Sequence, residues 1–373
     1  MGEVCNSFEY GLNAAAKEFD GINKYIRITD IDDDSRVFLD SDLTSPDCDL
    51  SSTEKYKLQD GDIVFARTGA SVGKTFIYKV SDGLVYYAGF LIRAKINANS
   101  YPDFVFYNTL TKEYEKFIRI TSQRSGQPGV NAQEYSSFEF SLPSYEEQKR
   151  IGRFFRNLDH LITLHQRKYD KLTKVKKSML EKMFPKNGAT VPEIRFKGFS
   201  DAWEQRKVSD AANRFDNLRV PVAANLRVSG TTPYYGANGI QDYVDGFTHE
   251  GEFVLVAEDG ANDLKNYPVK CVNGRIWVNN HAHVLQAKPK IADNKYLAYS
   301  LSQVDIESLL VGGGRAKLNA EIMMEIEIYI PTLNEQAAIG RYFTTLDNLI
   351  TLHQRELEKL KNIKKACLEK MFV

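Results

Sequence analysis

The most constraining feature of this 373-residue sequence is a long segment that occurs twice. Residues 143–184 align without a gap onto residues 331–372, and 25 of the 42 positions are identical. Seven identical residues in a row, LITLHQR, stand at 161–167 and 349–355, which is 188 positions apart. Repeats of 20 to 50 residues stacked in series would indicate a solenoid. Here dissimilar sequence precedes each copy, so the order is variable, constant, variable, constant.

Each constant segment has the pattern of one long amphipathic helix. Ser144 with Glu147, and Thr332 with Glu335, follow a proline and form the capping-box signature of a helix start. Apolar-stripe positions then recur at alternating spacings of three and four. They are Ile151, Phe155, Leu158, Ile162, His165, Tyr169, Leu172 and Met179, and Ile339, Phe343, Leu346, Ile350, His353, Leu357, Leu360 and Cys367. The first helix should end near Pro185 after about 40 residues, roughly 60 Å.

A single apolar stripe must be buried, and the other copy is the obvious partner. An antiparallel pair is simplest because a compact domain connects the end of one helix to the start of the other. A pseudo-twofold axis would then pass near Leu164, so we expect His165 and His353 to lie close together, and aspartate at either position to loosen the pair and weaken complex assembly. Gene duplication without a special role for the midpoint is the alternative. The predicted helix-pair interface consists of Leu158, Ile162, His165, Leu172, Leu346, Ile350, His353 and Leu360.

The variable segments read as two mixed domains of the same fold. Strand-like runs include DIVFARTG and LVYYAGFLIRAK in the first segment, and EFVLVAEDG and GRIWVNNHAHVLQA in the second. Matching marks, such as residues 68–70 against 259–261, and Asn131 against Asn319, favour a shared fold with diverged surfaces. The sequence therefore predicts an α+β fold in which two long antiparallel coiled-coil helices separate two domains in a pseudo-twofold internal repeat. The predicted boundaries are 1–142, 143–186, 187–330 and 331–373.

Length and composition bound the function. The chain is long enough for two domains, and it has neither an apolar run of about 18 residues nor a signal peptide, so we expect a cytoplasmic protein without a membrane partner. Its four cysteines are far apart and are expected to be reduced. Net charge is zero, but residues 143–186 carry 12 Lys and Arg against 5 acids, whereas both variable segments are slightly acidic. A basic helix permits nucleic-acid binding, although a solvated face explains it as well.

Several motifs resemble catalytic or metal sites without completing one. Gly69, Gly73, Lys74 and Thr75 are one residue short of the phosphate-loop spacing. The run HAH at 281–283 offers two imidazoles but no third ligand for a metal. The acidic run at 30–34 lacks the ordered glycine and glutamate of a calcium loop. The amino-methyltransferase signature N-P-P-Y is also absent from the sequence. We therefore predict no catalytic site and no metal site.

Two sequence features together resemble the specificity subunits of Type I restriction-modification enzymes. One is P-x-x-x-E-Q-x-x-I-G-x-x-F followed by L-D-x-L-I-T-L-H-Q-R, which is present in both constant segments. The other is VPEIRFKGFSDAWEQRK at 191–207, which is similar to the family's lead-in to a target-recognition domain. The resemblance covers the whole chain.

The resemblance implies two target-recognition domains, residues 1–142 and 187–330, each reading one half of an asymmetric bipartite site in double-stranded DNA. It further implies that the helices hold the domains apart and dock two methyltransferase subunits, and that restriction and translocase subunits join the complex. The chain itself would be non-catalytic, with S-adenosylmethionine, ATP and Mg on the partner subunits only.

One departure from the family pattern concerns the lead-in, which precedes only the second recognition domain. Met1 corresponds to roughly residues 209–211 of the second half, so about 18 residues of that half have no counterpart before the first domain. We therefore expect a truncated, rearranged or late-initiated member whose first domain is less stable and docks its methyltransferase less well.

Base readout requires Arg, Lys, amide and small hydroxyl side chains on exposed loops. The predicted DNA-binding residues are Arg67, Thr68, Ser71, Lys74, Arg124, Ser125 and Gln127 in the first domain, and Asn262, Lys265, Asn280, His281, Arg315 and Lys317 in the second. Ordinary loop structure explains each of them equally well. Two other functions stay open: an enzyme, which binding of S-adenosylmethionine or ATP by the pure chain would reveal, and a coiled-coil scaffold without DNA, which gel shifts would separate.

Overall fold

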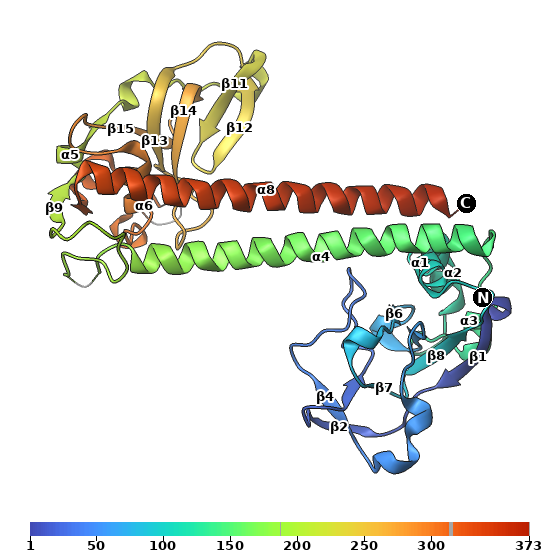
Figure 1. Ribbon diagram of the computed structural model, residues 1–373. Helices are drawn as coiled ribbons and strands as arrows, with labels where there is room; N and C mark the ends of the chain where they lie inside the picture. Colours follow the sequence, from blue (N-terminus) through green and yellow to red (C-terminus); the bar gives the residue numbers. More distant parts are fainter. Residues whose placement is uncertain (187, 313–315, 373) are drawn as a thin grey trace. The chain divides into compact units, whose positions relative to one another are not determined.

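The computed structural model describes residues 1–186, 188–312 and 316–372, and the chain forms two compact units (Figure 1). Unit 1 comprises Met1–Gln166 and Arg355–Val373, and unit 2 comprises Arg167–Gln354. Each unit contains one variable domain, the first part of one constant helix and the last part of the other. No helix in the described part of the chain combines the length and the apolar composition needed to cross a bilayer.

Both predicted long helices are present. Helix α4 (Tyr145–Lys182) has 38 residues and α8 (Leu333–Met371) has 39. At the start of α4 the Ser144 hydroxyl accepts a hydrogen bond from the Glu147 amide at 3.4 Å, in agreement with the capping pattern. At the start of α8 the Glu335 carboxylate binds the Arg195 guanidinium, a role that the capping pattern did not predict.

Within unit 1 the two helices run antiparallel. Asp159 of α4 pairs with Lys364 of α8 at 2.6 Å, and four residues earlier on α4 the Phe155 ring lies 5.5 Å from the ring of Phe372, eight residues later in the chain than Lys364. Residue numbers therefore fall along one helix as they rise along the other.

Unit 2 repeats this pairing with the helices exchanged. Asp347 of α8 pairs with Lys176 of α4, and these positions are the duplicates of Asp159 and Lys364. Eight residues after Lys176 in the chain, the Phe184 ring lies 6.1 Å from the ring of Phe343, which is four residues before Asp347. The antiparallel arrangement predicted from the sequence is confirmed inside each unit.

The predicted contact at the helix midpoints involves both units. His165 belongs to unit 1 and His353 to unit 2. Their proximity therefore stays a prediction.

The variable domain of unit 1 is built on a four-stranded antiparallel sheet. Its strand order is β1 (Cys5–Tyr10), β8 (Leu91–Ile96), β5 (Ile63–Ala66) and β6 (Thr75–Ile77). Two small sheets pair β2 (Ala15–Glu18) with β4 (Thr44–Asp47), and β3 (Lys24–Ile26) with β7 (Val85–Tyr87). The helices are α1 (Pro102–Asn108), α2 (Lys112–Thr121) and α3 (Ala132–Ser136). The 3-10 turns are η1 (Gly2–Val4), η2 (Leu50–Ser52), η3 (Glu54–Tyr56), η4 (Gly69–Ser71) and η5 (Val80–Asp82).

The variable domain of unit 2 has a larger, six-stranded sheet. Its order is β10 (Ala212–Arg214), β15 (Ala282–Ala287), β13 (His249–Ala257), β14 (Val269–Val278), β11 (Ser229–Gly236) and β12 (Gly239–Val244). A separate pair joins β9 (Glu204–Lys207) to β16 (Glu327–Ile330). The helices are α5 (Val208–Ala211), α6 (Asn294–Leu301) and α7 (Ala320–Glu325), and the 3-10 turns are η6 (Asp216–Leu218), η7 (Ala224–Leu226) and η8 (Glu307–Leu309).

The two domains share a core topology, as the sparse sequence marks predicted. In each, the first of four strands pairs with the last, the last pairs with the second, and the second pairs with the third: β1-β8-β5-β6 in unit 1 and β10-β15-β13-β14 in unit 2. Register agrees as well, because Ile63 faces Ala94 and Val254 faces Leu285, each pair 191 positions apart from its counterpart. Asn131 and Asn319 are the N-cap residues of α3 and α7.

The glutamine that both constant segments share fixes each helix to the domain beside it. In unit 2 the Gln336 side chain accepts a hydrogen bond from the Asp293 amide at 2.9 Å and donates to the carbonyls of Ile291 and Pro331. In unit 1 the Gln148 side chain accepts from the Tyr101 amide at 3.0 Å and donates to a proline carbonyl. Both glutamines are buried, so each satisfies backbone groups that water cannot reach.

The glycine and phenylalanine of the same motif let the helix approach the domain closely. A Cβ on Gly152 would lie 2.9 Å from the backbone nitrogen of Phe104, and a Cβ on Gly340 would lie 3.0 Å from the Cβ of Lys295. Three positions further on, Phe155 and Phe343 are fully buried. Full burial of such a side chain contributes about 1.5–3 kcal/mol. The motif E-Q-x-x-I-G-x-x-F is therefore a docking face between helix and domain.

A tyrosine from each domain completes the ion pair between the two helices. In unit 1, Tyr107 of α1 donates to Asp159 at 2.7 Å, and Lys364 lies 5.7 Å from the Tyr107 ring centroid. In unit 2, Tyr299 of α6 donates to Asp347 at 2.7 Å beside Lys176. Burial raises the pKa of both phenols, so both stay neutral donors. Domain, first helix and second helix therefore meet at one point in each unit.

Candidate nucleic-acid interface

The structure brings the two candidate loops of unit 1 together. The Gly69 amide donates to the carbonyl of Pro128 at 3.0 Å, and the Val130 amide donates to the carbonyl of Arg67 at 2.9 Å. The side-chain amide of Gln127 lies over Gly69, where an added Cβ would be 2.8 Å from the Gln127 nitrogen, and Gly69 has a φ of 73°. A glycine is favoured there, because a side chain at this positive φ would be strained.

The cationic side chains of these loops already have partners. Lys74 pairs with Asp33 and is largely buried. Arg124 pairs with Glu134. The Arg67 guanidinium lies 5.0 Å from the ring centroid of Tyr10. Among the predicted DNA-binding residues of these loops, Arg124, Ser125 and Gln127 are exposed, while Arg67, Thr68 and Ser71 are half-buried.

The stretch from Gly69 to Thr75 does not have the environment of a phosphate loop. Gly69–Ser71 form a three-residue 3-10 turn, and no α-helix of the described chain begins there. The Thr75 hydroxyl is buried and hydrogen-bonded to that of Thr109 at 2.7 Å. A phosphate-loop lysine and hydroxyl would have to face the ligand instead.

Unit 2 places its candidate loops at the corresponding points of the fold. The Leu318 amide donates to the carbonyl of Glu258 at 2.7 Å, as Val130 does to Arg67 in unit 1. Asp259 and Lys317 then form a β-bridge. Lys317 pairs with Glu258 at 2.6 Å, and its neighbour Arg315 lies outside the described residues.

The loop with Asn262 and Lys265 extends this surface. The Asn262 amide donates to the side chain of Asn238 at 2.9 Å, and the Asn238 side chain donates to the carbonyl of Gly260. Asn262 and Lys265 are both exposed. The loop is thus held in place by its backbone, and its side chains face solvent.

Asn280 and His281 line a concave site of about 300 Å³. The other lining residues are Pro221, Val222, Ala223, Arg227, Tyr234, Gln241 and Asn279. Asn279 is buried, and its side chain accepts from the His281 amide at 2.8 Å, so it orders the loop. His281 itself binds Asp259.

Sequence reasoning missed Arg227 and Gln241 in this site. Both are far from Asn280 along the chain. The parallel pairing of β11 with β14, in which Tyr234 faces Trp277, brings them to the same place. Local sequence patterns carry no signal of such a pairing.

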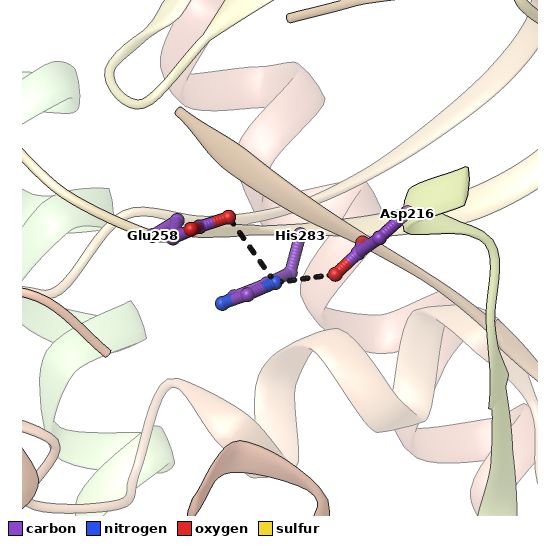
Figure 2. A group of neighbouring side chains, drawn as sticks. All are labelled: Asp216, Glu258 and His283. Carbon is purple, nitrogen blue, oxygen red and sulfur yellow. Dashed lines mark hydrogen bonds and ion pairs between the residues drawn. The ribbon is translucent and has the colours of Figure 1, made fainter. Parts of the chain in front are cut away.

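A buried charged group lies behind these loops in unit 2. Figure 2 shows the His283 imidazole between the carboxylates of Asp216, in η6, and Glu258, the residue that follows β13. His283 Nδ1 lies 2.7 Å from Asp216 and its Nε2 lies 2.8 Å from the carbonyl of Leu318. Each ring nitrogen of His283 therefore has an oxygen partner within hydrogen-bond distance.

Two cationic side chains complete this group. Arg219 and Lys317 both bind the Glu258 carboxylate. Burial acts to raise the pKa of Asp216, but hydrogen bonds from His283 and the Val284 amide outweigh it and lower the pKa. Burial is likewise outweighed at Glu258, where Lys317 and Arg219 lower the pKa. The carboxylates are already neutralised by protein cations, so the group has the character of a structural ion-pair network.

The predicted helix-interface residues divide between the units. Leu158 and Leu360 belong to the main core of unit 1, and Leu346 and Leu172 belong to a core cluster of unit 2. The residues nearer the helix midpoints, Ile162, His165, Ile350 and His353, are half-buried.

Comparison with known sequences decides the family. The Type I restriction modification DNA specificity domain matches two segments of the chain, residues 1–174 and 200–362. The chain belongs to this family. As a specificity subunit it serves DNA sequence recognition in a restriction-modification complex, and its own role is recognition and not catalysis.

Individual relatives agree with this assignment. A type I restriction enzyme specificity subunit of Haemophilus influenzae is 43% identical over 164 residues, which is 44% of this chain and 42% of that protein. The Type I restriction enzyme MjaVIII specificity subunit of Methanocaldococcus jannaschii is 20% identical over 337 residues, 83% of this chain and 78% of that protein. The match to the Haemophilus subunit thus spans less than half of its length.

A solved structure shares the fold. The S subunit of a Type I restriction-modification system from M. genitalium matches with a TM-score of 0.70 at 13% identity, over 98% of this chain and 93% of that one. The fold class predicted from the repeat is thereby confirmed: two target-recognition domains and two long helices in an α+β protein.

Proposed function

We propose that the domain of each unit reads one half of an asymmetric bipartite site in double-stranded DNA. One observation carries the proposal. The hydrogen bond from Val130 to Arg67 in unit 1 has its counterpart from Leu318 to Glu258 in unit 2, so the loops around it occupy the same place in both domains. The backbone there is equivalent while the side chains differ. Two domains with the same backbone arrangement but different loop side chains would recognise two different half-sites.

The proposed contact residues are the exposed members of these loops. They are Arg124, Ser125 and Gln127 in unit 1, and Asn262, Lys265 and Asn280 in unit 2. Amide and guanidinium groups make bidentate contacts to base edges, while lysine contacts to phosphates fix register. Arg67, Thr68, Ser71, Lys74 and His281 are half-buried, and the exposed Lys317 is held by Glu258, so we propose that these six residues support the loops from behind. The half-site centres should lie about one helical turn apart, near 34 Å.

Exchange of residues 1–142 for the corresponding domain of another family member should change one half-site only. The reason is that each recognition domain carries its own loops, while the helices and the other domain stay the same. Methylome sequencing of a host that expresses the complex measures both half-sites at once. Exchange of residues 187–330 is the matched control and should change the other half-site. A change in both half-sites after one exchange, or in neither, contradicts the modular account.

The constant helices are proposed to dock two methyltransferase subunits, and through them the restriction subunits. Leu161 and Leu164 in unit 1 are exposed, and so are their duplicates Leu349 and Leu352 in unit 2. Four exposed leucines in an identical sequence are unusual for positions that serve only the fold, because burial would stabilise them. Duplicated apolar surfaces suit two copies of one partner.

Leu164→Asp together with Leu352→Asp should weaken methyltransferase binding at least tenfold. A charge at the centre of an apolar interface is desolvated without a partner. Affinity is measured by titrating the purified methyltransferase onto the chain. Leu226→Asp is the matched control, since Leu226 is also an exposed leucine but lies in the recognition domain of unit 2. Unchanged affinity of the double variant would place the docking surface elsewhere.

A further inference from the structure

The lead-in of the second half is an integral part of unit 2. Its strand β9 pairs with β16, with Glu204 opposite Ile330 and Lys207 opposite Glu327. Arg195 donates from two nitrogens to the buried Glu335 carboxylate, each at 2.7 Å.

The same lead-in also places an aromatic side chain in an apolar cluster of unit 2. The Trp203 indole is buried, and it packs edge-to-face on Phe184 and Tyr296 with ring centroids 6.1 and 5.9 Å apart. Strand pairing, an ion pair and an aromatic anchor therefore bind one segment.

Unit 1 contains the receiving half of this arrangement. Residues 139–142 precede α4 as β16 precedes α8, and Glu147 corresponds to Glu335. Phe104 corresponds to Tyr296, and Phe372 to Phe184. Their rings lie 5.4 Å apart in unit 1, against 5.8 Å for the matching pair in unit 2. The Met1 nitrogen donates to the carbonyl of Phe138, as the Val208 amide does to that of Ile326 in unit 2.

The described residues of unit 1 leave the matching space open. A cavity of about 480 Å³ lies there. It is lined by Phe104, Asn108, Thr111, Glu113, Phe138, Glu139, Phe140, Ser141, Leu142, Pro143, Glu147, Ile151, Met371 and Phe372. Leu142 is 50% exposed, whereas its counterpart Ile330 in β16 is 6% exposed. Glu147 is exposed, whereas Glu335 is buried.

We propose that this cavity, together with the edge formed by residues 139–142, which correspond to β16, binds a polypeptide segment of the same pattern as residues 194–207. An arginine of the segment pairs with Glu147, an aromatic residue enters the cavity beside Phe104 and Phe372, and an extended run adds a strand to the edge. The three acidic side chains around the cavity, Glu113, Glu139 and Glu147, favour a basic segment. Main-chain hydrogen bonds supply affinity and the side-chain pockets supply selection, as in other cases of strand addition.

A synthetic peptide that copies residues 191–207 of this chain provides the probe. Titrated onto the full chain and followed by the anisotropy of a dye on its N-terminus, it should bind saturably with one copy per chain. The same peptide with Trp203→Ala should bind at least tenfold more weakly, because the aromatic anchor is lost. This comparison needs no change to the protein.

A charge exchange assigns the binding to unit 1. Glu147→Lys in the chain should weaken the peptide at least tenfold, and the peptide with Arg195→Glu should then regain affinity for that variant. Glu146→Lys is the matched control, because Glu146 is the exposed neighbour on α4 and does not line the cavity. The peptide could otherwise displace the lead-in of unit 2, and such exchange would be insensitive to Glu147.

Three results would overturn the proposal. One is the absence of saturable binding up to about millimolar peptide. Another is equal affinity of the parent chain and the Glu147→Lys variant. The third is self-association of the chain through this edge, observed by sedimentation as a dimer that the peptide does not dissociate.

Discussion

Replacement of Gln336 by glutamate is expected to lower the free energy of unfolding of unit 2 by about 3–5 kcal/mol, the range for a buried charge without compensation. The two side chains have nearly the same shape, so packing is preserved. The amide nitrogen of Gln336 donates to the carbonyls of Ile291 at 3.0 Å and Pro331 at 2.8 Å. A carboxylate oxygen there would face two acceptors in a site without solvent.

The loss should depend on pH with a definite sign. Burial beside two carbonyls raises the pKa of the carboxyl introduced by Gln336→Glu above that of the unfolded chain, which is about 4.3. Stability is therefore retained below the unfolded pKa, where the protonated acid still donates one hydrogen bond, and lost as pH rises toward the folded pKa. The difference from the parent chain should be smaller at about pH 5 than at about pH 8.

Urea unfolding followed by tryptophan fluorescence measures this effect in the right unit. The chain has two tryptophans, Trp203 and Trp277, and both belong to unit 2. Gln354→Glu is the matched control, since Gln354 is exposed on the same helix, and it should change stability by no more than about 0.5 kcal/mol. Equal transitions for the Gln336 variant and the control would show that the buried glutamine is not needed for docking of α8.

Arg195→Ala is expected to destabilise unit 2 by a similar amount, about 3–5 kcal/mol. The substitution leaves the fully buried Glu335 carboxylate without its bidentate partner. It also removes the hydrogen bond from Arg195 to the carbonyl of Asp201, which closes the lead-in on itself. The same fluorescence-detected unfolding measures the loss.

Two further variants separate the ion pair from other causes. The double substitution Arg195→Met with Glu335→Leu removes both charges, and should recover most of the stability lost in Arg195→Ala, because replacing a buried pair by apolar residues is often neutral. Arg206→Ala removes an exposed arginine whose partner Glu204 is two residues away, and should cost at most about 1 kcal/mol. If the double variant were as unstable as Arg195→Ala, the uncompensated charge would not be the cause.

The Gln336 and Arg195 variants both test how a constant helix is attached to its variable domain, which offers a reason for the duplicated motif. Gln148, Gly152 and Phe155 of α4 make the same kinds of contact with the first domain that Gln336, Gly340 and Phe343 of α8 make with the second. Each contact joins a constant helix to a variable domain. A domain that keeps the few residues touched by the motif can therefore change its loops without disturbing its attachment.

The sequence by itself determined the elements and their duplication. The three-and-four spacing predicted both long helices, and the runs named from alternation and β-branched content contain β5 and β15 and overlap most of β8 and β13. These features depend on residues that are neighbours within one or two helical turns or along one strand. The spacing of apolar residues is therefore enough to predict them. Comparison of the two halves then predicted that the two variable segments share a fold, because equal spacing of matching residues indicates equal structure.

Only the tertiary structure decided which side chains act together. Lys74 and Lys317 read as free loop cations, yet they pair with Asp33 and Glu258, which no spacing connects to them. Arg227 joins Asn280 only through the parallel pairing of β11 with β14. Ion pairs and strand pairings between distant segments depend on the final positions of the backbone. A pattern read along the chain therefore does not predict them.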